Sequence, residues 1–281
     1  MSIMFSGRKL IIATKHQKEK AIAPLFEKEL GIICITDERL DTDVLGTFTG
    51  EIERKQDPIS TAREKCFLAM NLSGCDMAVA SEGSFGAHPS AFFITADDEF
   101  IMFIDKKNNL EIIARELSME TNFHGEEIYN LQQLLDFSRK VQFPSHGIIL
   151  RNSKNDNDII IKGITNYALL EESYHKLTEG RTSIFAETDM RAMYNPTRMG
   201  VIEQAAQKLI QKIKSCCPAC NMPGFGVTDA KKGLRCNLCN SPTNSILYYI
   251  YSCSHCSFVK EEMFPNGKTT EDPMYCDHCN P

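Results

Sequence analysis

The sequence predicts an α/β domain with a mixed sheet, followed by a small cysteine-rich C-terminal domain. Short apolar runs alternate with stretches of helical periodicity up to residue 214, which is typical of strands and helices in one sheet domain. Nine of the 12 cysteines fall within residues 216–281. Hydrophobic residues make up 42% of the 281 residues, enough apolar side chain to bury a sizeable core. We therefore expect two domains, residues 1–214 and 215–281.

The first elements are predicted in the order strand, helix, strand. Residues 9–13 form a short apolar run, and apolar residues then recur with helical spacing over 15–30 until Gly31 ends the pattern. Residues 32–36 form a second predicted strand. This order within roughly 30 residues indicates a βαβ unit and therefore an α/β sheet.

The rest of the first domain continues this alternation. A polar loop is expected over 41–58 and a helix over 59–72. An apolar strand over 77–80 then enters a glycine-rich turn over 81–89. The later predicted strands are 90–95, 99–104, 111–117, 146–150 and 159–163, and the later helices are 126–136, 166–177 and one that begins with Asn195 as its cap and Pro196 at its first position.

The charge and the hydropathy pattern disfavour several classes of protein. The net charge of -6 argues against general nucleic-acid binding, since proteins that hold duplex phosphates usually carry a basic excess. No apolar run approaches the length of a membrane span. Residues 1–9 lack the cationic and apolar segments of a signal peptide. We expect a cytoplasmic protein that spans no membrane.

Four Cys-x-x-Cys turns dominate the tail, with 15, 13 and 19 residues between successive turns. Each turn presents two thiolates, and two turns supply the four sulfur ligands that Zn²⁺ prefers. This spacing is typical of zinc ribbons, so we expect two structural zinc ions. The predicted ligands are Cys217, Cys220, Cys236, Cys239, Cys253, Cys256, Cys276 and Cys279. Four cysteines per ion leave no position for water, so catalysis at zinc is not expected.

The pairing of the four turns is open between two arrangements. We favour sequential pairing, the first turn with the second and the third with the fourth, because each set then closes a short loop. Cross-braced pairing, the first turn with the third, is the alternative. A disulfide scaffold would require a secreted context. Residues 216–281 carry five Lys/Arg and six Asp/Glu, a balance that suits a protein partner better than phosphates.

The junction between the first strand and its helix is a candidate phosphate site. Thr14, Lys18 and Lys20 lie there, and the N-terminus of a helix attracts anions through its unpaired amides and its dipole. A solvated first turn of the helix is the alternative.

Three acids and one lysine form the second set of candidates. Glu51 and Glu53 would point to one side of an extended segment, as a carboxylate pair suited to Mg²⁺. Lys65, on the following helix, would face the same space; a charged surface loop is the alternative. Glu82 follows the strand over 77–80, and α/β sheets gather their ligands at the carboxyl ends of strands.

These segments resemble the house-cleaning nucleoside triphosphate pyrophosphatases, of the inosine/xanthosine triphosphatase kind. Ala13-Thr14 resembles the motif after that superfamily's first strand, and residues 61–66 (TAREKC) resemble its Asn-Ala-x-x-Lys-Ala helix. Residues 79–83 (VASEG) resemble its acidic turn, and 188–192 (TDMRA) its base-contact motif. The whole chain also resembles a bacterial domain-of-unknown-function family that joins such a domain to a Cys-x-x-Cys tail.

The resemblance implies a Mg²⁺-dependent hydrolase acting on a nucleotide or a related phosphate compound. Glu82, with Glu51 or Glu53, would hold the metal and act as the general base. The implied substrate ligands are Thr14, Lys18, Lys20, Lys65, Arg191 and Arg198. The alternative is a non-catalytic zinc-ribbon adaptor or a nucleotide sensor that binds a protein partner through its tail.

Overall fold

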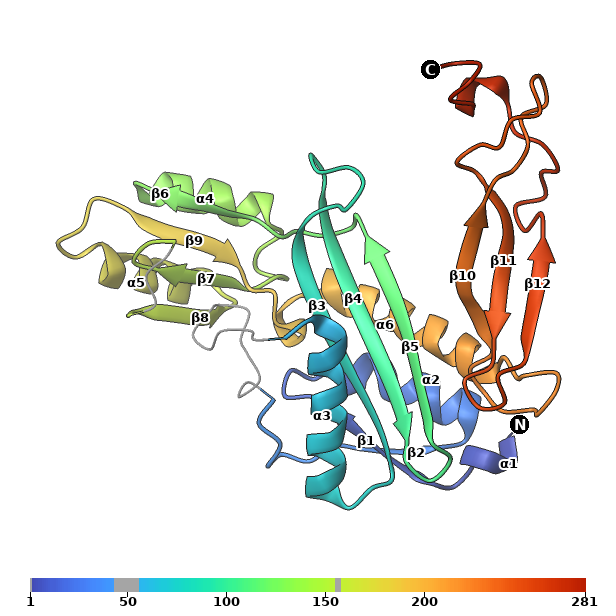
Figure 1. The fold of residues 1–281 in the computed structure, drawn as a ribbon. Coiled ribbons are helices and arrows are strands. Elements are labelled where there is room, and N and C mark those ends of the chain that lie inside the picture. The colour runs from blue at the N-terminus through green and yellow to red at the C-terminus, as the bar shows by residue number, and fades with distance from the viewer. Residues whose placement is uncertain (1, 43–55, 155–157) are drawn as a thin grey trace. The chain divides into compact units, whose positions relative to one another are not determined.

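The computed structural model describes residues 2–42, 56–154 and 158–281 (Figure 1). The chain divides into two units, Met1–Ile210 and Gln211–Pro281, and the division falls inside α6 (Pro196–Lys214). The boundary after Lys214 that the sequence indicates stays a prediction. None of the helices in the described ranges combines the length and the apolarity that a bilayer span requires.

A mixed five-stranded sheet with the order β2-β1-β3-β4-β5 forms the centre of the first unit. β1 pairs in parallel with β2 and β3, whereas β3–β4 and β4–β5 are antiparallel. The mixed α/β sheet that the sequence predicts is therefore confirmed. The strands are β1 (Lys9–Ala13), β2 (Ile33–Ile35), β3 (Met77–Ala87), β4 (Thr95–Asp105) and β5 (Leu110–Ser118).

Helices cover both faces of this sheet (Figure 1). α3 (Pro58–Ser73) packs Cys66 and Met70 into an apolar cluster with Ala78 of β3. On the opposite face, Phe26 of α2 (Glu19–Leu30) meets Phe103 of β4 with ring centroids 6.4 Å apart. α6 lies on that second face as well, and a short α1 (Ser2–Phe5) precedes the sheet.

The third strand is longer than the sequence indicates. β1 ends at Ala13, opposite Ala80, but β3 continues to Ala87 in register with β4. The predicted glycine-rich turn over 81–89 is therefore wrong for residues 81–87, which are strand. The predicted strand over 90–95 is also wrong, because β4 begins only at Thr95.

Four antiparallel strands form a second sheet in the same unit, with the order β6-β9-β7-β8. Its elements are β6 (Gly125–Ile128), α4 (Leu131–Lys140), β7 (Ile148–Arg151), β8 (Ile160–Ile164), α5 (Tyr167–Thr178), β9 (Ile184–Thr188) and the 3-10 turn η2 (Ala192–Tyr194). Phe137 of α4 and Leu170 of α5 are buried in one apolar cluster with Ile148 of β7. Both helices therefore cover the same face of this sheet.

Two features of the second sheet depart from the sequence analysis. The predicted helix over 126–136 is wrong at its start, because Asn130 caps α4 by accepting a hydrogen bond from the amide of Gln133 at 2.9 Å. Residues 125–128 pair with β9 instead. β9 itself is a strand that the sequence analysis does not name.

The second unit is built on three antiparallel strands with β11 in the middle. They are β10 (Gly226–Lys232), β11 (Ile246–Ser252) and β12 (Val259–Met263), followed by the 3-10 turn η3 (Pro273–Tyr275). Its apolar cluster is small and contains Phe225, Tyr251 and Phe258 beside the cysteines. A core of this size gives the unit little hydrophobic stabilisation of its own.

Candidate functional site

The four Cys-x-x-Cys turns share one local geometry. In each, the residue after the second cysteine donates its amide to the carbonyl oxygen of the first cysteine, at 2.8 to 3.1 Å. These donors are Asn221, Asn240, Ser257 and Asn280. The first three adopt φ near 60°, a left-handed conformation that Asn tolerates better than most residues. The sequence thus closes each turn locally, and both thiols of a turn are presented together.

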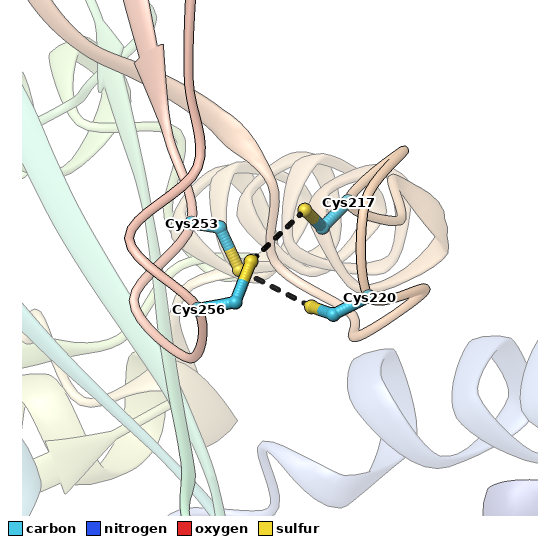
Figure 2. Close-up of side chains that lie close together, drawn as sticks. All are labelled: Cys217, Cys220, Cys253 and Cys256. Atoms are coloured by element: carbon cyan, nitrogen blue, oxygen red, sulfur yellow. Dashed lines mark hydrogen bonds between the residues drawn. The ribbon is translucent and has the colours of Figure 1, made fainter.

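The turns combine into two groups of four cysteines. In the first, Cys217 lies 3.7 Å from Cys256 and Cys220 lies 3.6 Å from Cys253, measured between sulfur atoms (Figure 2). The second group unites the other two turns, and its corresponding sulfur distances are 3.9 Å for Cys236 with Cys279 and 3.6 Å for Cys239 with Cys276.

These distances fit a tetrahedral metal site. Zinc–sulfur bonds of about 2.3 Å place the corners of a tetrahedron about 3.8 Å apart, which is the spacing of the sulfurs in both groups. All eight cysteines are free thiols, and each ligand set lies within 4.8 Å. Both groups could therefore hold a metal ion such as zinc.

The favoured sequential pairing of the turns is wrong, and the sheet explains why. In the antiparallel register, Gly226 at the start of β10 lies opposite Ser252 at the end of β11. The first and third turns flank these two positions and so meet at one end of the sheet. At the other end, Lys232 lies opposite Ile246, and Tyr248 lies opposite Met263 at the end of β12. The second and fourth turns meet there, which is the cross-braced alternative.

A separate group of buried charges lies in the first unit, around β3 and β4. On the α3 face of the sheet, Lys65 forms an ion pair with Glu82. Both side chains are largely buried, and Glu82 lies within β3 instead of at a turn. The structure thus brings together two of the residues that the sequence analysis names.

The opposite face of the same strands holds a second ion pair. Arg198 of α6 donates through Nε to Oε1 of Glu99 on β4, at 2.6 Å, and through Nη1 to the carbonyl oxygen of Met190. The Glu99 carboxylate and the Arg198 guanidinium lie directly over Gly83 of β3, where a Cβ atom would come 2.8 Å from Nη2 of Arg198 and closer still to Glu99. Glycine in this strand therefore makes room for a close approach of side chains.

Lys18 lies beside β3 where β1 has ended. Its Nζ donates to the carbonyl oxygen of Ser81 at 2.9 Å and to the Ser81 hydroxyl at 3.0 Å. Burial lowers the pKa of Lys18 to about 8, and the positive charge of Arg198 acts in the same direction, whereas Glu99 and Glu82 oppose it. The pKa of Lys18 therefore depends on charges on both faces of the sheet.

Asp97 completes the group on the α6 face. It precedes Glu99 by two residues on β4, so both side chains lie on one side of the strand. Burial and, secondarily, the negative charge of Glu99 together raise the pKa of Asp97 to about 8. Perturbed carboxylates of this kind are concentrated at functional sites.

The other residues named from the sequence lie elsewhere or have local roles. Thr14 accepts hydrogen bonds from the amides of His16 and Lys18, at 3.1 and 3.2 Å. Lys20 bonds to Gln17 at an exposed position. Arg191 forms an ion pair with Asp189 at 2.6 Å and stacks on Tyr194. Glu51 and Glu53 lie outside the described residues.

Two acids of the buried group, Asp97 and Glu99, are missing from the sequence analysis. A signal for them exists in the sequence. Asp97 and Glu99 alternate on the same side as Ile101 and Phe103, so a strand extended back to residue 95 places both acids on an apolar, buried face. A predicted strand that begins at residue 99 does not include Asp97, so the alternation of the two acids is not visible in it.

Comparisons with known proteins identify a family but no activity. A family model described as "Domain of unknown function (DUF6671)" matches residues 65–281. Protein VC0702 from Vibrio cholerae, whose crystal structure is known, is 13% identical to this chain in sequence. The structural match has a TM-score of 0.34 and covers 73% of this chain and 93% of that chain. The search of curated proteins gave no match.

Replacing one turn tests the cross-braced pairing. In Cys217→Ser/Cys220→Ser, we expect the zinc content to fall from two ions per chain to one, because only one ligand set is lost. Alkylation should then modify Cys253 and Cys256 and leave the second group of four cysteines protected, which mass spectrometry would detect. Modification of Cys236 and Cys239 instead would show sequential pairing.

Gly83→Ala tests the close approach over β3. The added methyl group meets Glu99 and Arg198, and we expect a loss of about 1–3 kcal/mol in the free energy of unfolding, measured by denaturant titration. Gly86→Ala is the matched control in the same strand, because its Cβ meets nothing within 4 Å. Equal effects of the two substitutions would contradict the steric explanation.

Proposed function

The chain belongs to the DUF6671 family, and we propose that it is a magnesium-dependent hydrolase of a nucleotide or a related phosphate compound, with two structural zinc ions in its tail. The observation that carries the proposal is the buried group of opposite charges around β3 and β4. Its members are Lys18, Lys65, Glu82, Asp97, Glu99 and Arg198. The resemblance to inosine/xanthosine triphosphate pyrophosphatases, in sequence motifs and in the expected fold, belongs to this proposal as well.

The energetic cost of burying these charges supports a functional role. Moving an ion from water into a protein interior costs several kcal/mol, and an ion pair recovers this only with good geometry. Apolar side chains would fill the same space at less cost. Ionisable groups at such positions are typical of sites that bind or transform charged substrates.

The lysines would act on the phosphate. Lys18 lies beside the part of β3 that β1 leaves uncovered, and Lys65 approaches β3 from α3. Two ammonium groups near one strand segment suit the charge that spreads over phosphoryl oxygens during transfer. Bound magnesium would add Lewis-acid polarisation of the phosphoryl oxygen.

Glu82 would act on the attacking water. In the structure its carboxylate accepts a hydrogen bond from Lys65. A bound phosphate that accepts the hydrogen bond of Lys65 in place of Glu82 would leave the Glu82 carboxylate available. It could then accept a proton from water, which is the role of a general base. Glu51 and Glu53 stay in the proposal as further acids.

Glu82→Gln tests the hydrolase. We expect a loss of roughly a hundredfold or more in the rate of magnesium-dependent phosphate or pyrophosphate release, since this is the scale of general-base catalysis. The assay would use a panel of nucleoside triphosphates selected by a thermal-shift screen with and without Mg²⁺. Glu111→Gln is the matched control, because Glu111 of β5 forms a half-exposed ion pair with Arg63, which lies on the same helix as Lys65. No hydrolysis of any nucleotide by the wild-type protein would refute the proposal.

A second function is supported by one feature of the tail. Leu238, Met274 and Tyr275 are 74%, 61% and 57% exposed, and all three lie within or next to the turns of the second cysteine group. Exposed apolar residues that gather in one place favour protein contact. On this alternative, the chain is a zinc-ribbon adaptor.

A photo-crosslinking amino acid at Leu238 tests the adaptor. We expect one discrete crosslinked partner in cells, and its loss when Tyr275→Ser is added, because both residues would belong to one contact surface. The crosslinker placed at Asp229, in β10 away from these turns, is the control. Crosslinks of equal pattern and intensity from both positions would exclude a specific contact.

A further inference from the structure

Three buried carboxylate oxygens in the first unit have no hydrogen-bond partner among the described residues. They are Oδ1 and Oδ2 of Asp97 and Oε2 of Glu99. Asp97 is 1% exposed and Glu99 is 0% exposed, so bulk water does not solvate them. Buried polar groups without partners are rare in native structures, and each calls for an explanation.

The cations on the same face are engaged with other groups. Lys18 directs its Nζ to Ser81, and Arg198 donates to the other oxygen of Glu99 and to the Met190 carbonyl. Arg115 pairs with Asp98, whose side chain points to the opposite side of β4. Within the part of the chain that the structure describes, Asp97 therefore has acidic and cationic neighbours but no direct ion pair of its own.

Either a proton or a bound cation could supply the missing partners of these oxygens. A proton shared between Asp97 and Glu99 would link one oxygen of each and leave the second oxygen of Asp97 without a partner. A cation between the two side chains would contact oxygens of both carboxylates, and its waters could reach the third. The cation therefore accounts for more of the unpaired oxygens than the proton does.

We propose that Asp97 and Glu99 bind a divalent cation of the Mg²⁺ or Mn²⁺ type. The donors are hard carboxylate oxygens, which suit these ions and not a soft metal. In the described ranges, groups of three or more potential metal ligands occur only among the cysteines. Two carboxylates are enough for Mg²⁺, which keeps several of its waters and takes its remaining ligands from substrate phosphates.

Gly83 and Arg198 position the Glu99 ligand. The absent side chain of Gly83 leaves space for the carboxylate over β3, and the bond from Arg198 Nε fixes its Oε1. Its Oε2 is thereby left for the cation. Partners that orient a ligand in this way are common around metal sites.

The cation site deepens the proposed function and, for its catalytic role, rests on it. Lys18 contributes to the electrostatics of both Asp97 and Glu82, so a phosphate beside β3 could contact the cation on one face and Lys65 on the other. The cation would then lie on the side of the strand opposite to Glu82. Cation binding itself can be measured without turnover.

Mn²⁺ binding to the full-length, zinc-loaded protein tests the site. Electron paramagnetic resonance would count free Mn²⁺ in a titration, and Mg²⁺ would be added as competitor. We expect one saturable site in the wild type and at least about tenfold weaker binding in Asp97→Asn, because a direct ligand is lost. Asp98→Asn is the matched control, since it removes the same charge from the adjacent residue on the opposite side of β4, and it should bind as the wild type does.

Other outcomes would overturn the site. Equal Mn²⁺ affinity in Asp97→Asn and the wild type, or loss of binding in Glu82→Gln alone, would place the cation elsewhere. Should Asp97→Asn fail to fold, Mn²⁺ broadening of wild-type amide signals replaces it: selective broadening at Gly83 and Glu99 supports the site, and its absence refutes it. Mn²⁺ binding without any nucleotide hydrolysis would retain the site and reject the proposed function.

Discussion

The ion pair between Arg198 and Glu99 is the interaction on which the first unit depends most. Both side chains are buried, and they join the first turn of α6 to the middle of β4 across 99 residues of chain. The pair tolerates only glycine beneath it, which explains Gly83 within a strand. Asn195 supports the arrangement, because its side chain accepts a hydrogen bond from the Arg198 amide at 3.0 Å and so starts the helix where the guanidinium can reach the sheet.

Unequal strand lengths make the neighbourhood of this pair chemically distinctive. β1 stops at Ala13, whereas β3 continues to Ala87 along β4. Beyond that point, Lys18 supplies a hydrogen-bond partner to the buried edge of β3 that β1 no longer covers. Charges from the residue before α2 and from α3, β4 and α6 are consequently placed around one strand segment. A lone helix terminus or a single acid would not produce this concentration of charge.

The tail relies on a different source of order. Its sheet has little apolar core. The four-cysteine groups at the two ends of the sheet are therefore the places where the strands can be held together. Metal bound there would supply folding free energy that the side chains alone do not provide. The cross-braced arrangement also joins segments more than 30 residues apart in the chain, so that each four-cysteine group holds one end of the sheet together.

The sequence by itself determined those features that depend on neighbouring residues. These features follow from spacing and capping over a few positions: the four Cys-x-x-Cys turns, the order of the first strand, helix and strand, and the start of α6 at Pro196. Only the tertiary structure decided which cysteine turns pair, because that depends on the register of β10 with β11. It also decided that Glu82 meets Lys65 while Asp97 and Glu99 face Arg198, since sheet register and helix packing bring together residues whose separation leaves no local pattern.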